Sequence, residues 1–134
     1  MDTKVRKLRR PDLVYPELSY QIIGALFEVA TDLGSGHKER FYQRAVGNAL
    51  RKIGLKVIEQ APVRILHGGK FVGIYYFDFL VEDKIVLEIK VRDFFSKKDI
   101  EQLYAYLKAK KLKLGIIAHF TKSGVKFKRV VNII

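Results

Sequence analysis

The sequence predicts a single α/β or α+β domain in which helices pack on a β-sheet, with the element order ααβββαββ. The first observation is the spacing of apolar residues, which is helical up to about residue 53, alternating over residues 55–91, and helical again over residues 97–111. The second is the length of 134 residues, which suffices for one hydrophobic core but not for two. We therefore expect a basic N-terminal arm over residues 1–16 and one domain over residues 17–134.

The helices are predicted from apolar spacing and from the glycines that follow them. The first spans residues 17–33, and Gly34 suits a helix C-terminal cap. The second runs from about residue 37 to residue 53 and ends at Gly54. The third covers residues 97–111, where apolar side chains recur at i, i+3, i+4 and i+7.

The strands are predicted from alternation and from turn residues. Pro62 suggests that the first strand lies at an edge or contains a bulge. The wholly apolar segment over residues 113–120 suits the interior of a sheet. The five predicted strands cover residues 55–68, 71–81, 84–91, 113–120 and 125–134.

The composition favours a nucleic-acid partner. Twenty-six lysines and arginines against fourteen acidic residues give a net charge of +12, and no acidic residue follows Glu101. Such a field attracts polyanions, although a basic protein of translation or of a membrane surface has a similar charge. The absence of cysteine excludes disulfides and thiolate catalysis and favours a cytoplasmic protein. No apolar run approaches the ~20 residues of a membrane span, so we expect no membrane segment.

Three charged residues stand in segments that otherwise have the composition of core strands. They are Asp78, Glu88 and Lys90, within YYFDFLVEDKIVLEIKV. Charged side chains are rarely buried unless they pair or bind a metal ion. Two carboxylates can hold a hard divalent cation, and a nearby lysine can position a water and offset charge on a phosphate. The trio therefore favours phosphodiester hydrolysis over its alternative, a structural salt bridge on a partly solvated sheet face.

Side-chain alternation predicts how these three residues meet. A two-residue turn at residues 82–83 would place charge in the apolar face of both strands. A three-residue loop over residues 82–84 instead gives one uniformly apolar face, with the pairs Val81–Ile85, Phe79–Leu87 and Phe77–Ile89. On the other face Asp78 then lies across from Glu88, with Cβ atoms ~5 Å apart, and Lys90 follows one step further. Like charges in this arrangement are destabilising unless a cation or proton lies between them.

Asp78 followed by Glu88-x-Lys90 on the next strand resembles the motif of the PD-(D/E)XK nuclease superfamily. The segment GHKERFY over residues 36–42 resembles the signature of its GxxExxY family. Gln102-x-x-x-Tyr106 on the following helix resembles the motif of RecB-type members. Phe77 stands where the proline in the superfamily's name would be. The four motifs occur in the expected order over nearly the whole chain beyond the basic arm.

The resemblance implies a restriction-endonuclease-like core with helices on a central mixed sheet. It implies Asp78 and Glu88 as metal ligands, the main-chain carbonyl of Ile89 as a further ligand, and Lys90 as the catalytic lysine. Glu39 would approach the metal from the second helix, directly or through a water. Its helical spacing to Tyr42 and Val46 favours an inward position, whereas a carboxylate in a first helical turn is also favoured by the helix dipole.

By the same resemblance, Gln102 and Tyr106 would support the site or touch the substrate backbone. Tyr42 is more simply explained by packing. Asp99 is expected to be a helix-start charge, and Asp93, three residues past Lys90, is a further candidate. The histidines, His37, His67 and His119, have no metal-ligand spacing.

These observations predict a nuclease that depends on Mg²⁺ (or Mn²⁺), and family analogy favours DNA over RNA. The alternative is a catalytically inactive nucleic-acid-binding module with the same fold, acting as a subunit of a larger complex. A protein-interaction scaffold fits the basic charge poorly. No aromatic stacking platform that would favour single strands is evident in the sequence. Sequence specificity would come from a partner or a homodimer.

Overall fold

The computed structural model describes residues 14–132, and within this range the chain forms three helices and five strands. The helices are α2 (Pro16–Leu33), α3 (Glu39–Lys52) and α4 (Lys97–Lys110). Helix α2 ends at Gly34 as predicted, because Gly34 adopts a positive φ of 71° and its N–H bonds the Ala30 carbonyl at 3.0 Å. The predicted basic arm lies, for residues 1–13, outside the described residues.

The strands form one mixed sheet in the order β1-β2-β3-β4-β5. They are β1 (Val57–His67), β2 (Lys70–Val81), β3 (Ile85–Val91), β4 (Leu114–Thr121) and β5 (Gly124–Val131). All neighbours are antiparallel except β3 and β4, which are parallel and are joined through α4. The predicted order ααβββαββ is confirmed.

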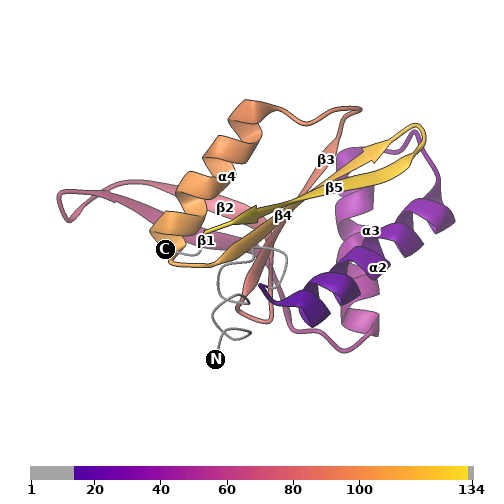
Figure 1. Cartoon of the computed structure of the whole chain (residues 1–134), viewed down its shortest axis with the longest axis horizontal. Coiled ribbons are helices and arrows are strands. Elements are labelled where there is room, and N and C mark those ends of the chain that lie inside the picture. The colour runs from indigo at the N-terminus through magenta and orange to yellow at the C-terminus, as the bar shows by residue number, and fades with distance from the viewer. Residues whose placement is uncertain (1–13, 133–134) are drawn as a thin grey trace, which may run out of the picture.

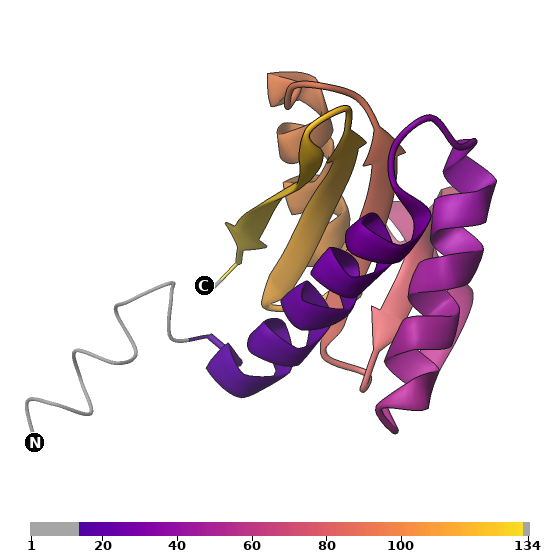
Figure 2. The same ribbon diagram turned by 90° about the vertical axis from the view of Figure 1, so that its right-hand side faces the viewer.

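Helices cover both faces of the sheet. Figure 2 shows α2 and α3 side by side on the near face, with α4 on the far side. Two cores result, one between the sheet and α2 and α3, and a smaller one between the sheet and α4. None of the described helices is long and apolar enough to cross a bilayer.

The loop between β2 and β3 has the predicted three residues. Val81 pairs with Ile85 and Phe79 pairs with Leu87. Glu82 and Asp83 take up left-handed conformations with φ of 53° and 57°, which reverses the chain within this short loop. Hydrophobic alternation therefore predicted the register correctly at the closed end of this hairpin.

The predicted uniform face is wrong at Phe77. Phe79 lies in the core under α2 and α3, whereas Phe77 lies in the core under α4. The register of β1 and β2 pairs residues on either side of Asp78 without pairing Asp78 to Gln60, and Gln60 has a positive φ of 52°. The regular pairing is interrupted at Gln60 of β1 and at Asp78 of β2, which lie across from each other. Side chains before and after this position therefore do not follow simple alternation between the two faces of the sheet. Asp78 thus occupies the irregular position of β2.

Candidate active site

Asp78 and Glu88 meet where strands β2 and β3 separate. The backbone ladder between these strands covers residues 79–81 and 85–87. Beyond it, the Asp78 N–H donates to Oε2 of Glu88 at 2.7 Å, and the Ile89 N–H donates to Oδ2 of Asp78 at 2.7 Å. Each carboxylate therefore replaces a backbone carbonyl of its own strand as the acceptor for the other strand. Asp78 and Glu88 are therefore not the backbone pair that was predicted. The two hydrogen bonds from N–H groups to carboxylates hold their side chains next to each other instead.

Burial makes this pair of carboxylates reluctant to ionise. Glu88 is only 6% exposed, and burial, followed by the charge of Asp78, raises the pKa of Glu88 to about 7. Burial also raises the pKa of Asp78, against the hydrogen bond from the Ile89 N–H, and the charge of Glu39 raises it further. Two such groups side by side are stabilised by a proton or a cation between them.

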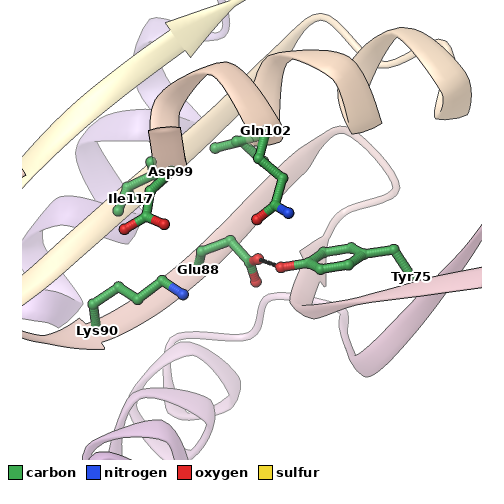
Figure 3. Close-up of a pocket in the computed structure, with 7 residues that line it drawn as sticks. Tyr75, Glu88, Lys90, Asp99, Gln102 and Ile117 are labelled. Carbon is green, nitrogen blue, oxygen red and sulfur yellow. Dashed lines mark hydrogen bonds between the residues drawn. The ribbon is translucent and has the colours of Figure 1, made fainter. Parts of the chain in front are cut away.

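Lys90 lies next to this pair on the face of Glu88. Its side chain is half-buried, and its ammonium group points toward the Glu88 carboxylate (Figure 3). Asp99 and Gln102 reach the same hollow from α4. The space between these side chains is about 10 Å³, close to the room that one water molecule needs.

Tyr75 completes the hollow, and it was not predicted from the sequence. Its hydroxyl donates to Oε1 of Glu88 (Figure 3). Its ring stacks on Tyr106 with centroids 4.0 Å apart and meets the edge of Phe77 at 5.5 Å. Burial, and then the hydrogen bond to Glu88, raise the pKa of Tyr75, so its hydroxyl stays a donor. By alternation Tyr75 should face away from Glu88; only the exchange of faces at Asp78 brings it there.

A family model of the PD-(D/E)XK nuclease superfamily matches residues 16–130 of the chain. The chain belongs to this superfamily. Members of the superfamily are generally dependent on divalent metal ions and act on nucleic acid. A search of curated proteins found no match. The GxxExxY family stays a prediction, because the matching model describes the superfamily alone.

Two solved structures share the superfamily fold. SSO0001 is 20% identical with a TM-score of 0.54, over 95% of this chain and 62% of that one. An alkaline exonuclease from Laribacter hongkongensis is 14% identical with a TM-score of 0.52, over 69% of this chain and 55% of that one. This chain thus spans less than two thirds of either protein. At these identities the likeness shows the restriction-endonuclease-like core and nothing finer.

Two of the residues expected from the superfamily motifs lie on α4. Gln102 is exposed at the rim of the hollow beside Glu88. Tyr106 is half-buried behind Tyr75 and contacts its ring rather than a carboxylate. Gln102 is therefore placed to meet a ligand, whereas Tyr106 supports the tyrosine that holds Glu88.

Helix α3 brings two side chains toward Asp78. Glu39, the first residue of the helix, is exposed rather than inward-facing, although its charge still acts on Asp78. The side chain of Gln43, one turn later, lowers the pKa of Asp78. The i, i+4 spacing from Glu39 was the only sequence signal for Gln43. Tyr42 packs as expected: its hydroxyl donates to the Gly34 carbonyl at 2.6 Å, which fixes the loop that starts α3.

Other polar residues near Lys90 play a structural part. Asp99 forms an ion pair with Arg92 at the start of α4. His119 pairs with Lys90 in the β3–β4 register, is fully buried, and lies against the Phe95 ring with centroids 4.0 Å apart. Burial, followed by the charge of Arg92, lowers the pKa of His119, so the ring is neutral. Asp93 is exposed and does not line the hollow.

The donor set fits a hard divalent cation better than a soft one. Among residues 14–132 no three histidine or acidic side chains converge, so Asp78 and Glu88 are the pair available. Mg²⁺ is commonly bound by one or two carboxylates, with waters and phosphate oxygens completing the shell. The raised pKa values of both carboxyl groups also favour a cation site here, because a bound cation would relieve the repulsion between the two carboxylates.

Proposed function

We propose that this chain is a metal-dependent nuclease that hydrolyses phosphodiester bonds, with Mg²⁺ (or Mn²⁺) as its ion and DNA favoured over RNA. One observation carries the proposal: Asp78 and Glu88 are held together across separating strands, under burial that disfavours their charge. Lys90 places a positively charged ammonium group beside these carboxylates, where it can offset negative charge on a phosphate. Outside catalysis this arrangement has no evident benefit for stability, because two buried carboxylates repel each other.

Each residue then has a definite role. Asp78 and Glu88 would hold the ion, with the Ile89 carbonyl and Glu39 as the predicted further ligands. When bound, the ion would acidify the attacking water and withdraw charge from a phosphate oxygen. Lys90 would orient that water or stabilise the negative charge that develops at phosphorus.

Substrate binding would rest mainly on charge. The net charge of +12 favours a polyanion, and binding should weaken steeply as salt is added. Gln102, exposed at the rim, would contact the substrate backbone. The preference for DNA rests on superfamily analogy, and the exonuclease among the structural neighbours supports the reaction class. A cytoplasmic location, favoured by the lack of cysteine, belongs to the same proposal.

Cleavage assays test this proposal directly. Plasmid, linear, single-stranded and branched DNA, and a matched RNA, are incubated with Mg²⁺ or Mn²⁺ and with wild type, Glu88→Gln or Lys90→Ala. We expect cleavage by wild type and a loss of ~100-fold or more in both variants. Glu101→Gln, which removes an exposed carboxylate of α4, is the matched control and should retain wild-type activity.

Two outcomes contradict the proposal. Equal residual activity in wild type and both site variants would mean that a contaminant cuts the substrate. Salt-sensitive DNA binding without cleavage under any metal would identify the catalytically inactive binding module instead. Circular dichroism of each variant shows that lost activity is not lost folding.

A further inference from the structure

The β1–β2 hairpin extends beyond the rest of the sheet. The residues of β2 that precede Phe79 pair only with β1, so this part of the hairpin is a two-stranded ribbon. Figure 1 shows this ribbon reaching past the C-terminal end of α4. One face of its base packs under α4, where Ala61 and Val63 are buried and the Lys110 ammonium donates to the Pro62 carbonyl at 2.6 Å. None of the helices described within residues 14–132 packs on the opposite face of this ribbon.

That opposite face is unusually apolar for an exposed surface. It consists of three cross-strand pairs: Pro62–Tyr76, Arg64–Ile74 and Leu66–Phe71. We call these six residues the hairpin platform. Four of them are large apolar side chains, exposed by 56% (Leu66), 54% (Phe71), 44% (Ile74) and 50% (Tyr76). Exposure of neighbouring apolar side chains on this scale marks an interaction surface.

A bulge assembles the platform. The register shifts between Ile65 and Leu66, which places Phe71 opposite Leu66 and on the face of Arg64. The Arg64 guanidinium lies over the Phe71 ring, 5.1 Å from its centroid. In unbroken alternation Phe71 would point to the other face, so the sequence alone shows no such platform.

Charge decides what kind of partner this surface fits. Residues 60–77 contain no acidic side chain, while Arg64 and Lys70 are basic. A second copy of this chain also carries +12, so like charge opposes self-association there, whereas a polyanion is attracted. Two exposed aromatic rings offer stacking surfaces for bases, and the guanidinium offers a phosphate contact. Only unpaired bases have free faces for such stacking, so a duplex fits less well.

The platform approaches the candidate active site only at Asp78, because the hollow beside Glu88 lies on the α4 side of the sheet and the platform lies on the other side. Tyr76 precedes Asp78 by two residues on β2. From Pro62 to Leu66 the platform is about 13 Å long at the usual rise of a strand, which is enough for a few nucleotides. We propose that the hairpin platform binds unpaired nucleotides of the substrate beside the bond to be cut. This inference rests on the proposed function for its nucleic-acid substrate, and it adds a single-stranded region as the class of substrate recognised.

The test measures binding without cleavage. Fluorescence anisotropy in EDTA compares a labelled oligo(dT) or oligo(rU) of ~20 nucleotides with a duplex of the same length. We expect Tyr76→Ala and Phe71→Ala each to weaken single-strand binding about tenfold, with less than about a twofold change for the duplex. Arg64→Gln should weaken it too and lower its salt dependence. Tyr20→Ala is the matched control, because Tyr20 is 80% exposed on α2, away from the hairpin.

Some results would overturn the proposal while leaving the nuclease assignment intact. Unchanged single-strand affinity in both ring variants, or an equal loss for single strand and duplex, would refute the platform. A wild-type dimer that Tyr76→Ala converts to a monomer, with single-strand binding unaltered, would make this face a homodimer contact instead. Glu88→Gln separates the two proposals, because it should abolish cleavage and retain single-strand binding.

Discussion

Replacing Glu88 by glutamine should make the metal-free protein more stable at pH 8 and remove most of the pH dependence of its stability. The reason is the burial of a carboxylate beside a second one, Asp78. Most active-site substitutions in a folded protein are neutral or destabilising. If Glu88→Gln is stabilising, the negative charge of Glu88 is unfavourable in the metal-free protein. Two carboxylates that bind a cation are expected to repel each other in this way when the cation is absent.

The size of the effect follows from the pKa of Glu88, which burial and the charge of Asp78 raise from 4.5 to about 7. Between these values the folded chain keeps a proton that the unfolded chain has released, so stability falls as pH rises. The whole shift corresponds to about 3 kcal/mol, of which about 2.5 kcal/mol is lost between pH 5 and pH 8. Glutamine has no proton to lose. It can still accept the Asp78 N–H and donate to the Tyr75 hydroxyl.

Urea unfolding in EDTA at pH 5 and pH 8 measures this difference. The wild-type midpoint should fall by about 1–2 M urea across this range, and the Glu88→Gln midpoint should fall much less. Glu101→Gln, an exposed change of the same chemistry, should follow wild type. Parallel pH profiles for wild type and Glu88→Gln would refute the reasoning, because Glu88 would then titrate normally.

Tyr75→Phe should slow cleavage about tenfold with little change in stability, because its ring stays stacked while the buried glutamate loses a hydrogen bond; an unchanged kcat would remove this hydroxyl from the mechanism. Millimolar Mg²⁺ should raise the Tm of wild type at pH 8 but not that of Asp78→Asn, measured by scanning fluorimetry; equal shifts would place the ion elsewhere. Gly115→Ala should lower the free energy of unfolding, measured with urea, by about 1–3 kcal/mol, because its Cβ would lie 2.9 Å from the side chain of Leu103 on α4. Gly24→Ala, whose Cβ meets nothing within 4 Å, should show no such loss.

The fold could be predicted well because its elements depend on local patterns. Apolar spacing gave the helices, and glycine at residue 34 ended α2 as a C-cap. The three-residue loop after β2 agrees with alternation, since a two-residue turn would have placed charge in the apolar face. Alternation failed at Phe77, where Gln60 takes a positive φ and the strand faces exchange. A conformation of one residue in a neighbouring strand is not a local pattern, so it was not predictable.

The candidate site was predicted in part for the same reason. Asp78, Glu88 and Lys90 were identifiable because charge in apolar strands needs an explanation. Tyr75 and Gln43 were missed, because their relation to the carboxylates depends on how β2 turns and on where α3 begins. Both reach the site through contacts between elements far apart in the sequence.

The sequence by itself determined the element order, the register of the β2–β3 hairpin and the choice of Asp78, Glu88 and Lys90 as candidate site residues. Hydrophobic periodicity and the cost of buried charge act residue by residue, so they can be read without the tertiary structure. Only the tertiary structure decided how those charges are held. The separation of β2 from β3 lets Asp78 and Glu88 each accept the other strand's N–H. The bulge in β2 brings Phe71 beside Arg64 on a face that is exposed among the described residues. These are departures from regular sheet geometry, and their energy is set by the packing of the whole domain rather than by local propensity.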